Sequence, residues 1–274
     1  FMLATLSRAL RHSGAEVHAL GVDINTEAAR VAEESLASST DGFEVKRGNV
    51  LTADLLPSHA AELVVYEPPW GVDWRSEQRA ITERETAGWY PFGLGPVSDS
   101  GWLFHQRALS ALRPASEGGG RLVTFLNATL LRDLRGRETR RSLVENDLLE
   151  AIVQLPGGLA ENTEIPLSLL ILRSDKPARL RGKAHVVDLR PYMTTQARGA
   201  RRRVNPEGLT TLWSALQTGR PGPSNRLVDV GAFGRRMVRV SRPGRDDIAW
   251  PAEVAEADSD RDVRRRYGSI PVEW

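Results

Sequence analysis

The sequence predicts an α/β fold, a doubly wound sheet with helices on both faces. Through residue 155, short apolar runs alternate with segments whose apolar residues recur at helical spacing, which is the pattern of strands joined by helices. One of the runs, residues 63–66, is continuously apolar, as expected for a strand buried on both faces of a parallel sheet. An apolar content of 41% is ample for the core of such a fold.

The first part of the chain predicts three strands and two helices. In chain order the expected elements are a helix over residues 2–12, a strand over 17–22 that ends at Asp23, a helix capped by Asn25 and Thr26, a strand over 43–46, and the strand over 63–66. Helical spacing indicates the helices, and short continuous or alternating runs indicate the strands. Pro68 and Pro69 must end the third strand, because proline has no N–H to donate to the hydrogen-bond ladder.

The middle of the chain is less regular. Residues 72–100 contain glycines, prolines, charges and aromatic side chains without clear periodicity, so we expect a long loop, a candidate lid or substrate-facing segment. The elements expected after it are helices over residues 101–112, 135–149 and 206–216, and strands over residues 122–126, 151–155, 167–172 and 185–189. No helical pattern separates residues 151–155 from 167–172, so we expect these strands to form an antiparallel hairpin at one end of the sheet.

The composition excludes several classes of protein. The chain has no cysteine, which excludes disulfides, thiolate catalysis and cysteine-bound metals and fits a reducing cytoplasm. The five histidines are scattered without the spacing of metal ligands, so we expect no metal site. No apolar run approaches the ~18 residues of a membrane span, and the first residues lack the length and basic leader of a secretory signal. We therefore expect a cytoplasmic protein with no membrane partner.

Positive charge is concentrated in the last third of the chain. Residues 1–172 carry 16 Lys and Arg against 23 Asp and Glu, whereas residues 173–274 carry 21 against 12. Such an asymmetry indicates contact with nucleic acid or with a partner surface, although a solvated basic face explains any single cluster equally well. We expect an α/β domain over residues 1–190 and a basic C-terminal extension over residues 191–274. The arginine clusters of the basic part are residues 201–203, 235–236 and 264–266.

The turn after residues 63–66 is the first candidate for a functional site. It presents Glu67 and Trp70 at the carboxyl edge of the sheet, where open α/β folds bind their ligands. A hydrogen-bond acceptor beside an aromatic ring suits a flat substrate that bears an amine, such as a nucleobase. The alternative is a proline-rich loop with a Trp on the surface, and these residues alone do not decide between the two.

Two more polar residues follow predicted strands. Asp23 ends the strand over 17–22, where an acidic residue in nucleotide-binding α/β folds accepts both hydroxyls of a ribose. Asn49 follows the strand over 43–46, and its amide can bind the edge of an adenine. Such residues are common at strand ends, so each position alone is weak evidence. Their order ahead of Glu67 strengthens both.

The order of these motifs resembles the amino-group DNA methyltransferases, most of all the modification subunits of type I restriction systems, which methylate adenine at N6. The family's second-strand acidic motif is similar to Gly21-Val-Asp-Ile-Asn25, its Gly-Asp-x-Leu to Gly48-Asn-Val-Leu51, and its Asn-Pro-Pro-Phe-Gly to Glu67-Pro-Pro-Trp-Gly71. Later segments similar to the family are residues 104–109, 119–121, 140–143, 148–156 and 163–172. The resemblance extends from Phe1 to about Asp188.

The resemblance implies a Rossmann-like sheet that uses S-adenosylmethionine to methylate an adenine flipped out of double-stranded DNA. In the family, a side-chain oxygen at the position of Glu67 and the carbonyl at the position of Pro68 accept the two N6 protons, while the aromatic residue, here Trp70, stacks on the base. The resemblance also implies two protein partners, a specificity subunit and a restriction subunit. The implied catalytic residues are Glu67, Pro68, Pro69 and Trp70, and the implied cofactor-binding residues are Asp23, Ile24, Asn49 and Val50.

The sequence departs from the family at three places. The family's glycine-rich loop ends in Gly-Gly-Phe-Leu whereas the chain begins at Phe1, so we expect the first strand and this loop to be missing from it. Asn49 replaces an Asp, which keeps an acceptor but loses the charge. Glu67 replaces an Asn or Asp, and its longer side chain moves the oxygens by about 1 Å.

These departures leave an alternative to an enzyme. The chain would then be a catalytically degenerate methyltransferase fold that serves as a DNA-binding or subunit-binding module. A small-molecule or protein-glutamine methyltransferase shares the Asn-Pro-Pro-aromatic type of motif. The basic half of the chain and the later segments argue against this third class.

Overall fold

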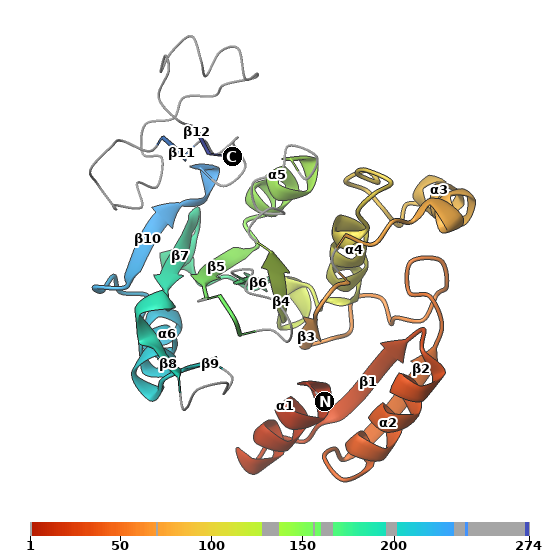
Figure 1. Cartoon of the computed structure of the whole chain (residues 1–274), viewed down its shortest axis with the longest axis horizontal. Helices are drawn as coiled ribbons and strands as arrows, with labels where there is room; N and C mark the ends of the chain where they lie inside the picture. Colours follow the sequence, from red (N-terminus) through yellow and green to blue (C-terminus); the bar gives the residue numbers. More distant parts are fainter. Residues whose placement is uncertain are drawn as a thin grey trace.

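Six strands form one mixed sheet in the spatial order β10-β7-β5-β6-β4-β3 (Figure 1). They are β3 (Leu63–Tyr66), β4 (Arg121–Asn127), β5 (Leu149–Gln154), β6 (Leu167–Arg173), β7 (Lys183–Asp188) and β10 (Asn225–Asp229). β3 is parallel to β4 and β5 is parallel to β7, whereas β6 runs antiparallel to both of its neighbours and β10 runs antiparallel to β7. The computed structural model describes residues 2–69, 71–127, 137–155, 157–159, 167–195, 202–232, 239–240 and 272–273.

Two further strands form a separate parallel pair. β1 (His18–Asp23) lies beside β2 (Gly42–Arg47), and helices α1 (Met2–His12) and α2 (Thr26–Ala37) contact this pair (Figure 1). The side-chain oxygen of Asn25 caps α2, because it accepts hydrogen bonds from two backbone N–H groups of the first turn. The cap fixes the start of α2 directly after the end of β1.

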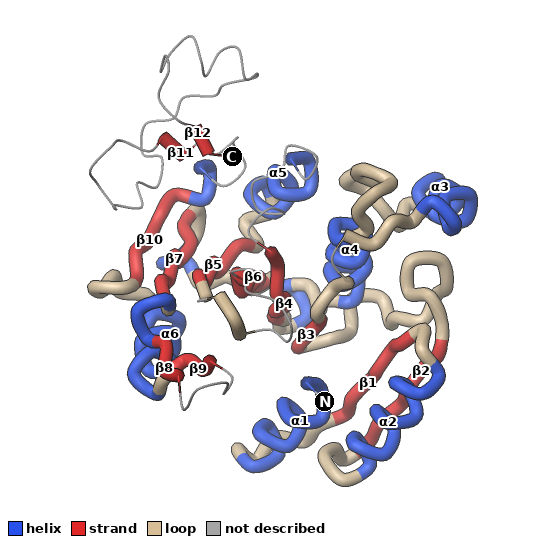
Figure 2. Tube along the Cα trace, viewed as in Figure 1, coloured by secondary structure: helices blue, strands red, loops and turns tan. Residues whose placement is uncertain are grey.

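Helices cover both faces of the six-stranded sheet (Figure 2). α4 (Gly101–Ala111) and α5 (Arg137–Glu145) pack on one face in a cluster of buried apolar residues, and α6 (Pro206–Thr218) packs on the other face in a second cluster. Adjacent residues of β5 alternate between the two: Ile152 belongs to the first cluster and Val153 to the second. The predicted doubly wound α/β fold is confirmed.

A third cluster of buried apolar residues joins the segment after β3 to α4. Its buried members are Leu51, Trp74, Ile81, Tyr90 and Leu103. None of the helices in the described part of the chain is long and apolar enough to cross a membrane.

The remaining elements are α3 (Gln78–Thr86), β8 (Met193–Thr195), β9 (Arg202–Val204), β11 (Arg239–Val240), β12 (Val272–Glu273) and short 3₁₀ turns at Arg75–Glu77, Ala115–Glu117, Ala178–Leu180, Arg190–Tyr192 and Val230–Ala232.

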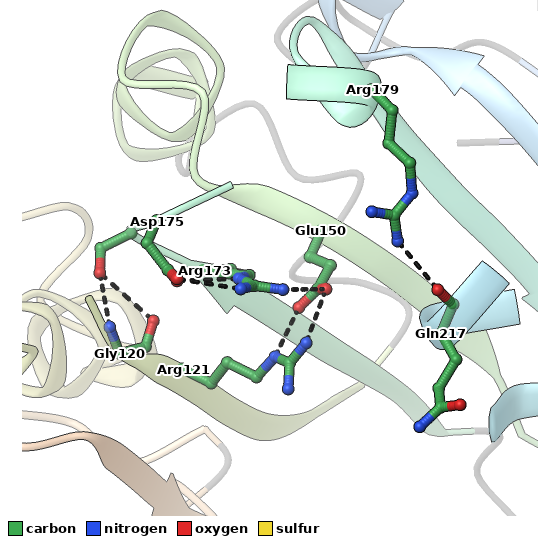
Figure 3. Close-up of polar contacts among 8 residues, drawn as sticks. Gly120, Arg121, Glu150, Arg173, Asp175, Arg179 and Gln217 are labelled. Carbon is green, nitrogen blue, oxygen red and sulfur yellow. Dashed lines mark hydrogen bonds and ion pairs between the residues drawn. The ribbon is translucent and has the colours of Figure 1, made fainter. Parts of the chain in front are cut away.

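A buried carboxylate fastens the edge of the sheet where β4 and β5 begin and β6 ends (Figure 3). Glu150 has no exposed side-chain surface, and Arg121 donates to its two oxygens at 3.0 and 3.1 Å. Arg173 lies 3.6 Å from one of these oxygens and also donates to Asp175 at 2.8 Å. Two guanidinium groups therefore compensate the buried negative charge. This cluster lies at the opposite edge of the sheet from the carboxyl end of β3.

Three sequence-based predictions are wrong in detail. β5 and β6 are antiparallel neighbours, but they lie in the middle of the sheet because β7 and β10 continue it beyond β5. Residues 72–100 are not only a loop, since they contain α3. The helix expected over residues 135–149 ends at Glu145, because Asp147 has a φ of 50° and a residue in this left-handed region cannot continue a right-handed helix.

Candidate functional site

The carboxyl ends of β1 and β2 lie side by side. Asp23 stands opposite Arg47, and the N–H of Gly48 donates to the Asp23 carbonyl at 3.0 Å. One carboxylate oxygen of Asp23 accepts from the N–H of Asn25 at 2.8 Å, and the other has no hydrogen-bond partner among the described residues. The next side chain, Ile24, is 69% exposed. A free carboxylate oxygen beside an uncovered apolar side chain fits a ligand that has sugar hydroxyls and a flat ring.

Asn49 begins a tight turn directly after β2. Its side-chain oxygen accepts from the N–H of Leu51 at 3.0 Å, and its carbonyl accepts from two further backbone N–H groups of the turn. Because an N–H needs an acceptor, the oxygen must face Leu51, and the amide nitrogen is the side-chain group that remains for a ligand. Asn49 and Val50 are both half-buried. Asn49 therefore offers a donor where the sequence led us to expect a free acceptor.

The predicted third strand coincides with β3, and the proline motif follows directly. Glu67 and Pro69 are exposed and Pro68 is buried. The side chain of Glu67 has no hydrogen bond or ion pair with another described residue. Trp70 lies outside the described residues. The carboxylate of Glu67 thus stands exposed at the carboxyl end of β3, as predicted.

A buried polar pair ties the end of β3 to α4. The hydroxyl of Tyr66 and Nδ1 of His105 are 2.7 Å apart, and the rings of His105 and Trp102 are T-shaped to each other at a centroid distance of 5.4 Å. His105 has no exposed surface, and its burial lowers its pKa to about 3, so the imidazole is neutral. Burial also raises the pKa of Tyr66. The pair fixes the backbone from which Glu67 projects.

α4 also holds the turn after β2. Nε of Arg107, two residues beyond His105, donates to the carbonyl of Val50 at 3.3 Å. One helix therefore contacts both parts of the candidate site, the end of β3 through His105 and the turn of Asn49 and Val50 through Arg107. Neither residue stands out in the sequence. The only signal is that they lie within residues 104–109, a segment similar to the family.

The two parts of the site suit different ligands. The ends of β1 and β2 offer a carboxylate oxygen, an apolar side chain and an amide to a nucleoside, and the end of β3 offers a carboxylate to an amine. Within the described ranges, no group of three or more His, Asp and Glu side chains is arranged to hold a metal ion.

Comparison with known proteins gives a consistent result. The model of the N-6 DNA Methylase family matches residues 2–221. The methylase subunit of the type I restriction enzyme MjaVII from Methanocaldococcus jannaschii is 25% identical over 181 residues, which are 62% of this chain and 30% of that protein. The methyltransferase subunit of a type I restriction-modification system from Streptococcus thermophilus has a TM-score of 0.69 and 18% identity, over 85% of this chain and 50% of the other.

A second solved structure supports the same fold. A Listeria monocytogenes protein assigned to the class I S-adenosylmethionine-dependent methyltransferases has a TM-score of 0.58 and 19% identity, over 79% of this chain and 60% of the other. At such identities the two structures establish the fold alone. The chain spans 30% of the length of the M. jannaschii protein and 50% of the S. thermophilus chain. The activity and partners of a whole protein of this kind are therefore matters for proposal.

Proposed function

Because the chain belongs to the N-6 DNA methylase family, we propose that it is part of an adenine-N6 DNA methyltransferase of the type I modification-subunit kind. One observation carries this proposal. α4 holds both strand-end motifs, the turn of Asn49 through Arg107 and the end of β3 through His105. A methyl transfer needs a cofactor site and a base site in fixed relation, and a shared helix supplies such a relation.

We propose that S-adenosylmethionine binds at the ends of β1 and β2. Its sulfonium supplies a methyl group that is already activated for transfer. Asp23 would accept from the ribose hydroxyls through its unpaired oxygen, while Ile24 and Val50 would contact the adenine ring. Asn49 would contact the edge of that ring. The exposure of Ile24 and the unpaired oxygen of Asp23 support this assignment.

We propose that the target adenine, flipped out of double-stranded DNA, binds at the end of β3. The Glu67 carboxylate and the Pro68 carbonyl would accept the two N6 protons and aim the nitrogen lone pair at the methyl group. Pro69 would keep the turn stiff, and Trp70 would stack on the base. The chain's own contribution to the rate is orientation of the two reactants.

Partners and domain organisation form a second part of the proposal. We propose a methyltransferase domain over residues 1–190 and a basic extension over residues 191–274 that contacts double-stranded DNA or a specificity subunit in the cytoplasm, with a restriction subunit as a further partner. Residues 191–274 carry 15 Lys and Arg against 10 Asp and Glu, and this excess of positive charge supports the role. The arginine clusters at 235–236 and 264–266 lie outside the described residues.

Cofactor binding and methyl transfer test the proposal in sequence. Calorimetry of the full-length gene product with S-adenosylmethionine should give saturable 1:1 binding, and a tritiated methyl group should then appear in duplex DNA when a specificity subunit is supplied. The absence of both would contradict an enzyme. If the protein binds DNA or the specificity subunit but neither binds the cofactor nor transfers a methyl group, the result would support the alternative, a catalytically degenerate binding module. The use of Asn49 to close its own turn favours that alternative.

Replacing Asn49 with Asp should tighten S-adenosylmethionine binding about tenfold. One carboxylate oxygen would still accept from the Leu51 N–H, as the amide oxygen does now, and the second would accept from the adenine amine. Titration calorimetry of the wild type and the variant checks this. Asn49→Ala is the comparison: it removes the turn's side-chain hydrogen bond and should weaken binding. An Asp variant that binds no better than wild type would show that the amide nitrogen is the preferred contact.

A further inference from the structure

Three successive carbonyls of the turn after β2 are held by side chains from another part of the chain. The carbonyls of residues 50–52 accept, in that order, from Arg107 Nε at 3.3 Å, the Tyr90 hydroxyl at 2.5 Å and Arg84 Nε at 2.9 Å. Tyr90 and Arg107 are buried, with 2% and 5% of their surface exposed. Because this turn directly follows Asn49, the three hydrogen bonds fix the backbone that presents its side chain.

Two guanidinium groups lie against the ring of Trp89. The Cζ atom of Arg107 is 3.8 Å from the centroid of the Trp89 ring, and the Cζ atom of Arg84 is 4.4 Å from it. Both distances are within the range in which a cation is attracted to the face of an indole, and partial burial strengthens the attraction. The ring therefore sets where each guanidinium stands and, through it, where each Nε meets the turn.

The segment that carries Trp89 is itself attached to α4. The side chain of Gln106 accepts from the N–H of Phe92 at 3.0 Å and donates to the carbonyl of Gly93 at 2.8 Å. The three side chains in contact come from two parts of the chain: α3 and the segment after it provide Arg84 and Trp89, and α4 provides Arg107. Arg84, Tyr90 and Arg107 each donate to a carbonyl of the turn, and none of these three hydrogen bonds is made to the six-stranded sheet.

We propose that Arg84, Trp89 and Arg107 are positioning residues for S-adenosylmethionine: they hold the turn after β2 in the conformation that receives the adenine ring. The inference rests on the proposed function, because it takes Asn49 and Val50 as contacts of the cofactor. It adds residues that do not touch the cofactor but set its affinity. Arg84 and Trp89 should affect binding of the cofactor and leave the methyl-transfer step alone, whereas Arg107 also belongs to the link between the two parts of the site.

The test uses the full chain and compares Trp89→Leu with Trp89→Phe. Leucine keeps apolar volume but has no aromatic face, so the dissociation constant for S-adenosylmethionine should rise about tenfold, whereas phenylalanine should restore most of the affinity. The methyl-transfer rate at saturating cofactor should stay within about twofold of wild type. Arg84→Met, a milder change at a half-buried position, should also weaken binding, and Arg79→Met is its matched control, because Arg79 lies in the same helix with its side chain 94% exposed.

Hydrogen exchange gives a readout that needs no cofactor. The N–H groups of Leu51, Thr52 and Ala53 are bonded within the turn, so they should exchange faster in Trp89→Leu than in wild type while exchange in β4 and β6 stays the same. If the wild type binds S-adenosylmethionine, an unchanged dissociation constant in Trp89→Leu would overturn this inference and leave the proposed function standing. Unchanged exchange at these three amides in Trp89→Leu would do the same. A wild-type chain that binds no cofactor would contradict the proposed function, and the positioning role would fall with it.

Discussion

Glu67→Asn is expected to raise the rate of methyl transfer to duplex DNA by about a hundredfold, because a 1 Å misplacement of a reacting group has an effect of this size. Glu67 is exposed at the carboxyl end of β3, and its side chain forms no hydrogen bond or ion pair with another described residue, so the substitution removes no such interaction. Asn is one methylene shorter and returns the acceptor oxygen to the position expected in the family. Initial rates of tritiated methyl transfer, with saturating cofactor and a specificity subunit present, measure the effect.

Two further substitutions at Glu67 separate length from charge. Glu67→Gln keeps the length of Glu and gains the amide, so it should not increase the rate. Glu67→Asp keeps the charge and has the shorter side chain, so it should increase the rate of methyl transfer. If Glu67→Gln matched Glu67→Asn, charge rather than reach would be the cause. A wild type as fast as Glu67→Asn would show that Glu is a competent acceptor at this position.

Local elements were predictable because their signals lie in consecutive residues. The strand over residues 63–66 and the helix over 2–12 match β3 and α1, since the proline stop and the apolar spacing are local. The place of β5 and β6 within the sheet was not predictable. It depends on β7, which pairs with β5, and on β10, which pairs with β7, because pairings between residues so distant in the sequence leave no local pattern. The same applies to Asp147, where a single left-handed residue ends α5 early.

The candidate site was predictable at its strand ends and not in its supports. Asp23, Asn49 and Glu67 are found at the ends of β1, β2 and β3 because strand ends can be read from the sequence. His105 and Arg107 were missed. Their segment, residues 104–109, is similar to the family, but nothing in it indicates that one residue will meet a tyrosine hydroxyl and another a backbone carbonyl, because only tertiary packing brings these groups together. The role of Trp70 stays a prediction, because it lies outside the described residues.

Acidification from pH 7.5 to pH 5 is expected to lower the free energy of unfolding by about 2 kcal/mol through His105 alone. Burial lowers its pKa from 6.5 to about 3 in the folded chain. The unfolded chain therefore binds a proton as the pH falls below 6.5, whereas the folded chain does not until about pH 3. Stability from this group is fully present above pH 6.5 and is lost progressively as the pH falls toward 3.

Urea unfolding of His105→Gln at the two pH values tests this. Glutamine can keep a hydrogen bond to the Tyr66 hydroxyl but does not titrate, so the variant should lose about 2 kcal/mol less than wild type on acidification. His18→Gln is the control for removal of a histidine from the surface, because the side chain of His18 is 70% exposed. Equal pH dependence in wild type and His105→Gln would mean that burial does not lower the pKa of His105. Because His105 is hydrogen-bonded to Tyr66, the residue before Glu67, the neutral ring belongs to the contact that joins the end of β3 to α4.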